Sequence, residues 1–210
     1  MLLVGLTGNI ASGKSSVARL LVQRGATLVD ADVLARLAVR RGEPAFEAIR
    51  ARWGDAVISR EGVLDRAALR ERVFSDETEL SALNSIVHPE VARLRDDLVA
   101  EARERGDRIV VCDIPLLFEK HLTEEFDVLI LVDAPRPTRL ERLVRDRKLD
   151  EADAMQMIAA QMPAELKRAR ADIIIDNTGT LEQLAERVAG VWQRLEQEAD
   201  RREGAASTVA

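Results

Sequence analysis

The sequence has very little cysteine, few aromatic residues and no long hydrophobic run. Cys112 is the only cysteine among 210 residues, so an intramolecular disulfide is excluded, which fits a reducing compartment. Aromatic residues make up 3% and tyrosine is absent, so the core must be aliphatic. No apolar run approaches the roughly 18 residues that a membrane span needs. We therefore expect a cytoplasmic protein without a membrane partner.

The amino-terminal segment also lacks the basic residues that begin a signal peptide. Residues 1–6 are apolar but few, and they predict a first buried strand. The net charge of −6 gives no support to nonspecific nucleic-acid binding. Hydrophobic residues make up 47% and charged residues 32%, which is ordinary for a globular protein with a real core.

Apolar segments of strand length alternate with helical patterns along the chain. The segments that read as strands are 2–7, 27–29, 108–113, 126–133 and 171–176. The first two are joined by a helical pattern within about thirty residues, which predicts a right-handed parallel βαβ unit. Residues 181–197 have helical periodicity. The expected fold class is therefore α/β with a parallel sheet.

Two long helical segments interrupt this alternation. Residues 33–105 are far too many for a simple crossover, which indicates an inserted helical substrate-binding subdomain. Residues 137–167 are rich in arginine and predict a helical lid. Polar and small residues predict a flexible tail over 201–210. The remaining parts form the core of a single domain spanning 1–200, at about 1–32, 106–136 and 168–200.

The most specific motif is a complete G-x-x-x-x-G-K-S, which follows the first strand and opens a helix. Such a loop points successive N–H groups at phosphate oxygens, and the helix adds its positive end. Lys14 would reach the β- and γ-phosphates of ATP, and the Ser15 hydroxyl would coordinate Mg²⁺. The motif predicts a three-layer P-loop fold. The expected nucleotide contacts are Gly8, Asn9, Ile10, Ala11, Ser12, Gly13, Lys14, Ser15 and Ser16.

Acidic residues follow two of the predicted strands. Asp30 and Asp32 come after the second strand, which we expect to be the neighbour of the phosphate-loop strand. A carboxylate there could accept the proton of an attacking hydroxyl, or it could simply cap the following helix. Asp113 ends a strand that we expect next to the phosphate-loop strand, where an acid near Mg²⁺ is common in such folds. Asp113 is therefore a candidate metal residue.

Further short motifs follow along the chain. Together with GLTGNIASGKS at 5–15, they are DADVLAR at 30–36, His88-Pro89, DIPLLFE at 113–119, Gln161-Met162 with Lys167, Ala171-Asp172 and Asp176-Asn177-x-Gly179. In this order they resemble the dephospho-coenzyme A kinase family over about residues 1–195. The resemblance implies an ATP- and Mg²⁺-dependent enzyme that phosphorylates the ribose 3′-hydroxyl of dephospho-CoA in the last step of coenzyme A synthesis. It also implies a nucleoside-monophosphate-kinase-like core with a helical CoA-binding subdomain and a lid.

The resemblance also implies roles for single residues. Asp32, rather than Asp30, matches the acid that activates the 3′-hydroxyl. Arg36 becomes a candidate for an acceptor phosphate, although it could instead brace Asp32. His88 becomes a candidate for the acceptor site, whereas its position alone indicates a hydrogen-bonding residue at a helix end. Asn177 becomes a candidate for the adenine of ATP, in a segment that otherwise reads as a good turn.

The last candidates are an apolar segment and the arginines of the predicted lid. Residues 115–118 offer an apolar wall for an adenine or a pantetheine arm, with Leu116 as the named contact, unless they are ordinary core. A guanidinium can stabilise the equatorial charge of the transferring phosphoryl group, and the resemblance favours Arg142 for this role because Arg142 aligns best. The other arginines read mostly as a solvated face, and those that could take the place of Arg142 are Arg139, Arg145 and Arg147.

Two other functions stay open from the sequence alone. One is another small-molecule P-loop kinase, acting on a nucleoside monophosphate, a sugar acid or a shikimate-like ring. The other is a nucleotide-dependent switch or regulatory module, although the N-K-x-D-type base reader of guanine switches is absent. The expected partners are ATP and dephospho-CoA, with no nucleic acid, in a monomer or small homo-oligomer.

Overall fold

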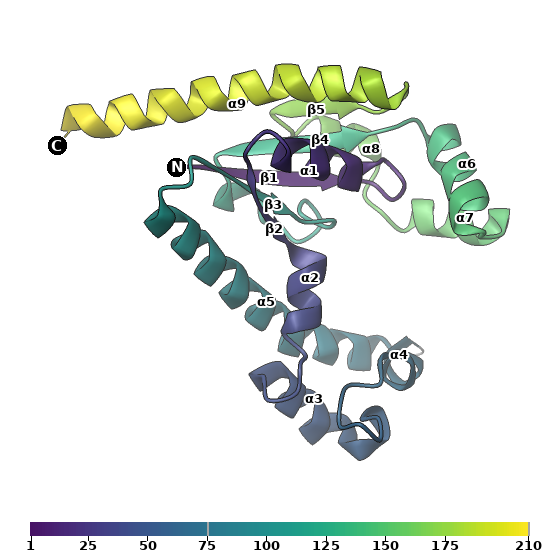
Figure 1. Cartoon of the computed structure of the whole chain (residues 1–210). Helices are drawn as coiled ribbons and strands as arrows, with labels where there is room; N and C mark the ends of the chain where they lie inside the picture. The colour runs from purple at the N-terminus through teal and green to yellow at the C-terminus, as the bar shows by residue number, and fades with distance from the viewer. Residues whose placement is uncertain (75, 210) are drawn as a thin grey trace. The chain divides into compact units, whose positions relative to one another are not determined.

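The computed structural model describes residues 1–74 and 76–209, without the side chains of 74 and 205–209 (Figure 1). The chain divides into two compact units. The first unit comprises residues 1–29 and 102–210, and the second comprises residues 30–101. No helix in the described part of the chain is long and apolar enough to cross a membrane.

The first unit is built on a five-stranded sheet with the strand order β2-β3-β1-β4-β5. The strands are β1 (Leu2–Gly8), β2 (Thr27–Asp30), β3 (Ile109–Asp113), β4 (Val128–Asp133) and β5 (Ile173–Asp176). β1 pairs in parallel with β3 and β4, and β4 pairs in parallel with β5. The α/β prediction is confirmed.

The prediction that the second strand is the neighbour of the phosphate-loop strand is wrong. β2 does not lie next to β1, because β3 lies between them. A βαβ crossover fixes its handedness but not the number of strand positions that it passes over. All five residues of β3 are buried, so β3 suits the inner position, while β2 is only partly buried.

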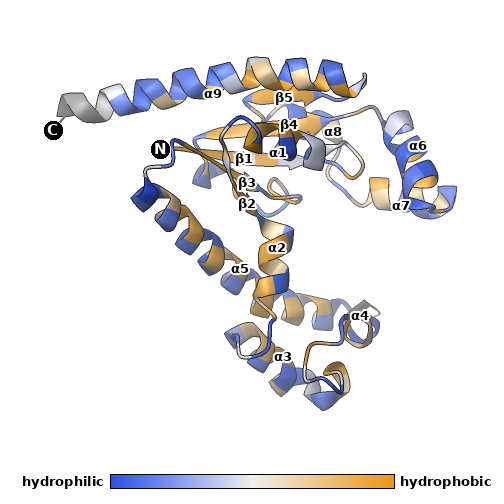
Figure 2. Cartoon of the chain, in the orientation of Figure 1, coloured by the Kyte–Doolittle hydropathy of each residue, from blue (hydrophilic) through white to orange (hydrophobic). Residues whose placement is uncertain are grey.

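Helices cover the sheet and bury its apolar side chains. Those of the first unit are α1 (Lys14–Val22), α6 (Arg136–Arg147), α7 (Glu151–Ala159), α8 (Ala164–Arg168) and α9 (Leu181–Val209), with a short 3₁₀ turn at Thr123–Glu125. Side chains of α1 and α9 join those of β1, β3, β4 and β5 in one core. Figure 2 shows the strands as predominantly hydrophobic, as expected for strands buried on both faces.

Helix α9 is longer than the sequence predicted. It continues to Val209, and residues 201–204, which we expected to begin a flexible tail, are helical. Within this extension, Arg202 Nη1 lies 2.7 Å from Oδ1 of Asp127, the residue before β4. The backbone of residues 201–209 is thus helical, the flexibility of this tail stays a prediction, and residue 210 lies outside the described residues.

The second unit is helical. Its elements are α2 (Ala31–Leu37), α3 (Pro44–Trp53), a 3₁₀ turn at Gly54–Val57, α4 (Arg66–Phe74) and most of α5 (Glu77–Arg105). It has its own apolar cluster of buried residues, which are Val39, Ala45, Ile49, Trp53, Val57, Leu69 and Val73. The unit begins and ends close to the predicted insertion at 33–105. Its role in binding substrate stays a prediction.

Helix α5 continues through Pro89, although we expected a helix end at His88. An internal proline removes one backbone hydrogen bond and crowds the preceding turn. Packing on both sides compensates for this loss. Leu83 and Ile86 pack against the cluster of the second unit, and Val99 is buried further along the helix.

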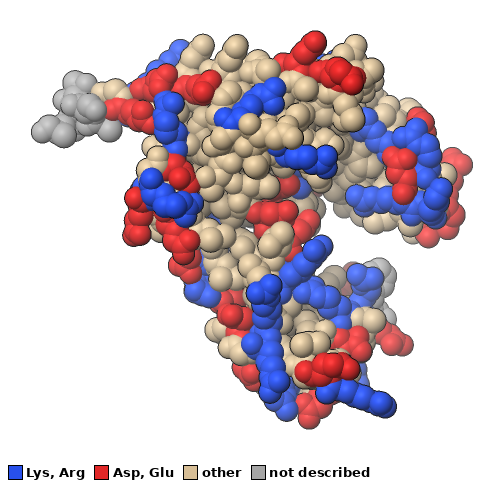
Figure 3. Space-filling model, viewed as in Figure 1, with Lys and Arg blue, Asp and Glu red and all other residues tan. Residues whose placement is uncertain are grey.

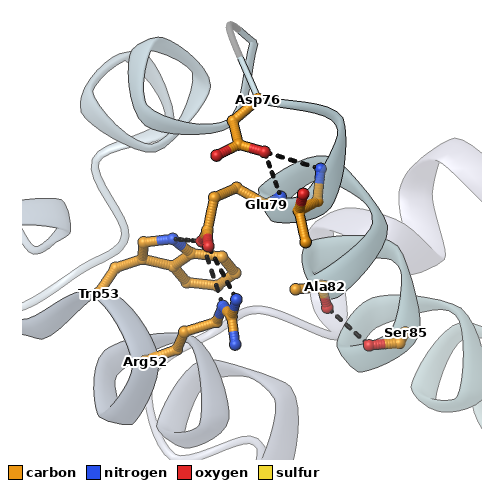
Figure 4. Close-up of polar contacts among 7 residues, drawn as sticks. Arg52, Trp53, Asp76, Glu79, Ala82 and Ser85 are labelled. Atoms are coloured by element: carbon orange, nitrogen blue, oxygen red, sulfur yellow. Dashed lines mark hydrogen bonds and ion pairs between the residues drawn. The ribbon is translucent and has the colours of Figure 1, made fainter.

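The start of α5 is fixed to the end of α3 by a polar network (Figure 4). Asp76 Oδ1 accepts the N–H groups of Thr78 and Glu79 at 2.8 and 3.4 Å and so caps the helix. Glu79 accepts Arg52 Nη2 at 2.8 Å and Trp53 Nε1 at 2.7 Å. The hydrogen bond from Arg52 holds the pKa of Glu79 below its ordinary value.

Candidate active site

The phosphate loop joins β1 to α1 in a conformation that two residues define. Gly13 has φ 91° and Ala11 has φ 60°, both in the left-handed region. This region costs a residue with a Cβ about 1–2 kcal/mol, so Ala11 is strained. At Gly13 a Cβ would also lie 2.0 Å from Asn177 Nδ2, so both the backbone and the available space require glycine there.

The loop presents unpaired donors of the kind that bind phosphate. Within the described residues, the backbone N–H groups of Ala11, Gly13, Lys14 and Ser15 donate to no protein atom. The side-chain oxygen of Ser12 is buried without a hydrogen-bond partner. Buried polar atoms normally have partners, so these groups fit an anionic ligand held at the start of α1.

Two predicted site residues meet beside the loop. Lys14 Nζ forms an ion pair with Oδ1 of Asp113, a residue that is 4% exposed. Asp113 reaches this position because it ends β3, in register with Leu6 of β1. The described residues hold no group of three or more His, Cys, Asp or Glu side chains that could bind a metal alone. The hydroxyl of Ser15 and the carboxylate of Asp113 are nevertheless hard oxygen ligands, as Mg²⁺ prefers when phosphates complete its shell.

Arg142 and Asn177 hold the loop from the other side. Arg142 Nη1 donates to the carbonyl oxygens of Ala11 and Ser12 at 3.1 and 3.3 Å, and its Nη2 donates to Asn177 O at 2.9 Å. The buried Asn177 side chain donates from Nδ2 to Ser12 O at 2.8 Å. Two predicted ligand residues therefore brace the loop carbonyls in this structure, and the strained Ala11 is held among these contacts.

The remaining arginines of α6 differ in their surroundings. Arg139 is buried, its Nε donates to Ala134 O at 3.0 Å, and burial lowers its pKa. Arg145 is exposed and pairs with Glu141 and Asp146. Figure 3 shows charges of both signs interspersed over α6 and α7, as on an ordinary solvated face.

The second unit contains the three predicted acceptor-site residues Asp32, Arg36 and His88. Asp30 caps α2, since its Oδ1 accepts the N–H groups of Asp32 and Val33 at 2.8 and 3.2 Å. Asp32 lies in the first turn, exposed, so the alternative in which Asp32 caps the helix is wrong. Arg36 is also exposed, and it forms no ion pair with Asp32 among the described residues. His88, the third, is exposed on α5.

The predicted apolar wall after β3 is mostly core. Leu117 and Phe118 are 0% and 1% exposed. Leu117 packs so close to Gly5 that a Cβ added to Gly5 would lie 2.7 Å from Cδ1 of Leu117. Leu116, in contrast, is 41% exposed. Leu116 is thus the leucine of this segment with an exposed apolar side chain, and its contact with a ligand stays a prediction.

The structure also places Gln161 beside the phosphate loop, although the sequence analysis assigned this residue no role. Gln161, which follows α7, accepts the backbone N–H of Ile10 through Oε1 at 2.7 Å. The only signal for it was its place in a motif of the resembling family. Nothing local distinguishes it from other glutamines, because its partner is distant in the sequence.

A strand, a G-x-x-x-x-G-K-S loop and a helix, with a lysine–carboxylate pair beside the loop, define a P-loop nucleotide-binding protein. The sequence profile of the family described as dephospho-CoA kinase matches residues 2–183. The chain belongs to this family, and the resemblance seen in the sequence is confirmed.

Individual relatives agree with this assignment. The chain is 50% identical to the dephospho-CoA kinase of Thermobifida fusca over 197 residues, which are 94% of this chain and 98% of that protein. It is 45% identical to the dephospho-CoA kinase of Bacillus licheniformis over 150 residues, 71% of this chain and 75% of that protein.

Solved structures share the fold. TT1252 from Thermus thermophilus has a TM-score of 0.78 at 40% identity, over 92% of this chain and 97% of that chain. The dephospho-CoA kinase from Campylobacter jejuni has a TM-score of 0.67 at 22% identity, over 92% of this chain and 96% of that chain, and supports the fold alone.

Proposed function

We propose that the chain transfers the γ-phosphoryl group of ATP to the ribose 3′-hydroxyl of dephospho-CoA, giving CoA and ADP. The observation that carries the proposal is membership of the dephospho-CoA kinase family over residues 2–183. The complete phosphate loop, with unpaired N–H groups at the start of α1, supports ATP as the donor.

Binding of ATP changes the partner of Lys14. Its ammonium leaves Asp113 and turns to the β- and γ-phosphates, where it meets the charge that develops during transfer. Ser15 and the released Asp113 would hold Mg²⁺, which supplies charge neutralisation between the phosphates when it is bound. Asp113 thus serves as a resting partner of the lysine and as a metal residue.

Asp32 is the proposed partner of the acceptor hydroxyl. Its exposed carboxylate, free of the capping task that Asp30 performs, orients the 3′-hydroxyl or takes its proton. The oxygen then attacks the γ-phosphorus, the bond to the β-phosphate oxygen breaks, and ADP leaves. Arg36 and His88 are the proposed acceptor contacts in the second unit, which we propose as the dephospho-CoA-binding subdomain.

The excursion of α6–α8 is the proposed lid. Arg142 keeps donors for a phosphoryl group, because a guanidinium carries five N–H groups and the loop carbonyls occupy only some of them. Asn177 is the proposed adenine contact from the segment after β5. Leu116 contributes exposed apolar surface to a ligand.

A product assay tests the function. ATP with dephospho-CoA should yield ADP and CoA, which carries one phosphoryl group more than dephospho-CoA, whereas AMP or shikimate in place of dephospho-CoA should yield no phosphorylated product. Phosphorylation of one of those acceptors instead would favour another small-molecule kinase. Slow ATP hydrolysis that no acceptor accelerates would favour a nucleotide switch. The cytoplasmic location, the lack of a nucleic-acid partner and the oligomeric state stay predictions.

A further inference from the structure

The strained phosphate loop is held by residues from outside the loop. Ile10 and Ala11 pack with Leu143, Ala154 and Ile158, an apolar cluster formed by α6 and α7. Ala11 occupies a left-handed conformation, which persists in proteins only where surrounding contacts determine it. The loop therefore depends on the α6–α8 excursion for its shape.

One hydrogen bond fixes the backbone directly before the strained residue. Gln161 Oε1 accepts the N–H of Ile10 at 2.7 Å, and this N–H is not one of the loop donors left for a phosphate. Gln161 therefore does not compete with a nucleotide. It orients the peptide unit between Asn9 and Ile10, one residue before the strained Ala11, and so constrains where the following donors point.

The backbone next to Gln161 is in turn held by an ion pair whose lysine is buried. The next N–H along the chain, that of Met162, donates to Glu119 Oε1 at 3.2 Å. Lys167 Nζ lies 2.7 Å from the same oxygen, and the Lys167 side chain is 0% exposed. A buried ammonium requires such a partner, so the two side chains hold each other in place. Glu119 belongs to the segment that follows β3.

We propose that Gln161 is a positioning residue for phosphoryl transfer, which shapes the phosphate loop through the Ile10 N–H and is itself positioned by the Glu119–Lys167 pair. The inference rests on the proposed kinase function. It assigns Gln161 no contact with either substrate. Its effect reaches the nucleotide only through the backbone of the loop.

The test compares Gln161→Met, which keeps the length of the side chain and removes the acceptor, with Gln156→Met on the exposed part of α7. In Gln161→Met, the dissociation constant of ADP with Mg²⁺ should rise and kcat should fall, each by about five- to ten-fold, the effect of one net hydrogen bond. The dissociation constant of dephospho-CoA should not change. Gln156→Met should match the wild type throughout.

Amide exchange provides a readout that does not require activity. The Ile10 amide should exchange faster in Gln161→Met, while Gln161→Glu, which keeps an acceptor oxygen, should retain its protection. A lower melting temperature with wild-type ADP binding and kcat in the folded protein would mean a merely structural role and would overturn the proposal. Unchanged exchange at Ile10 would overturn it as well. If the wild type failed to phosphorylate dephospho-CoA, the proposed function would fall, but ADP titration and exchange would still test Gln161.

Discussion

Replacing Gly13 by alanine tests the geometry of the phosphate loop in two independent ways. The residue has φ 91°, and a Cβ there would lie 2.0 Å from Asn177 Nδ2. The Asn177 amide would have to move, which breaks its 2.8 Å hydrogen bond to Ser12 O. Gly13→Ala should therefore strain the backbone and also release a buried side chain.

The two effects can be added. The left-handed conformation costs an alanine about 1–2 kcal/mol. The lost hydrogen bond costs about 1–2 kcal/mol, at the lower end because Arg142 still donates to Ser12 O. The free energy of unfolding should thus fall by about 2–3 kcal/mol, which lowers Tm by about 4–12 °C in a chain of this size.

Thermal unfolding of three variants separates the terms. Gly25 also has a positive φ, 109°, but nothing lies within 4 Å of an added Cβ, so Gly25→Ala should show the backbone cost alone. Gly190 lies in α9 with the same open space, so Gly190→Ala should raise stability by about 0.5–1 kcal/mol. If Gly13→Ala lowered Tm no more than Gly25→Ala, the contact with Asn177 would be refuted.

Three further predictions concern single side chains. Lys14→Ala should lower kcat by about 10²–10³ while the protein stays folded, and near-wild-type turnover would contradict its role. Asp32→Asn should slow single-turnover phosphorylation of dephospho-CoA by about 10²–10⁴. Asp30→Ala should instead lower stability by about 1 kcal/mol, because Asp30 is the helix cap. Arg52 lowers the pKa of Glu79, so the stability that Glu79 contributes is present above its unfolded pKa and lost as pH falls through its folded pKa. Glu79→Gln should therefore flatten the decline of Tm below about pH 4.5, and an unchanged decline would contradict the pairing.

Local signals made the strands and the phosphate loop predictable. β3 and β4 are continuous apolar runs, and the loop motif is contained in a few consecutive residues. The place of Asp113 followed from its position at the end of a strand. The capping residue was not predictable, because Asp30 and Asp32 are equally good caps and only the backbone at Asp30 decides between them.

Long-range choices were not predictable in the same way. The position of β2 in the sheet depends on a strand that lies almost eighty residues later in the sequence. The continuation of α5 through Pro89 depends on tertiary packing, which the helix propensities of the neighbouring residues do not predict. The contacts of Gln161 with Ile10 and of Lys167 with Glu119 join residues that are distant in the sequence. They therefore exist only in the folded chain and leave no local signal.

The complete burial of Lys167 gives the protein an internal reporter of local opening. An amine-reactive reagent can reach this side chain only when the surrounding segment opens, so its labelling rate measures that opening. Lys148, which is exposed at the end of α6, reacts without any opening and serves as the reference. The ratio of the two rates, with and without nucleotide, would show whether occupation of the phosphate loop slows the motion of the segment that supports it.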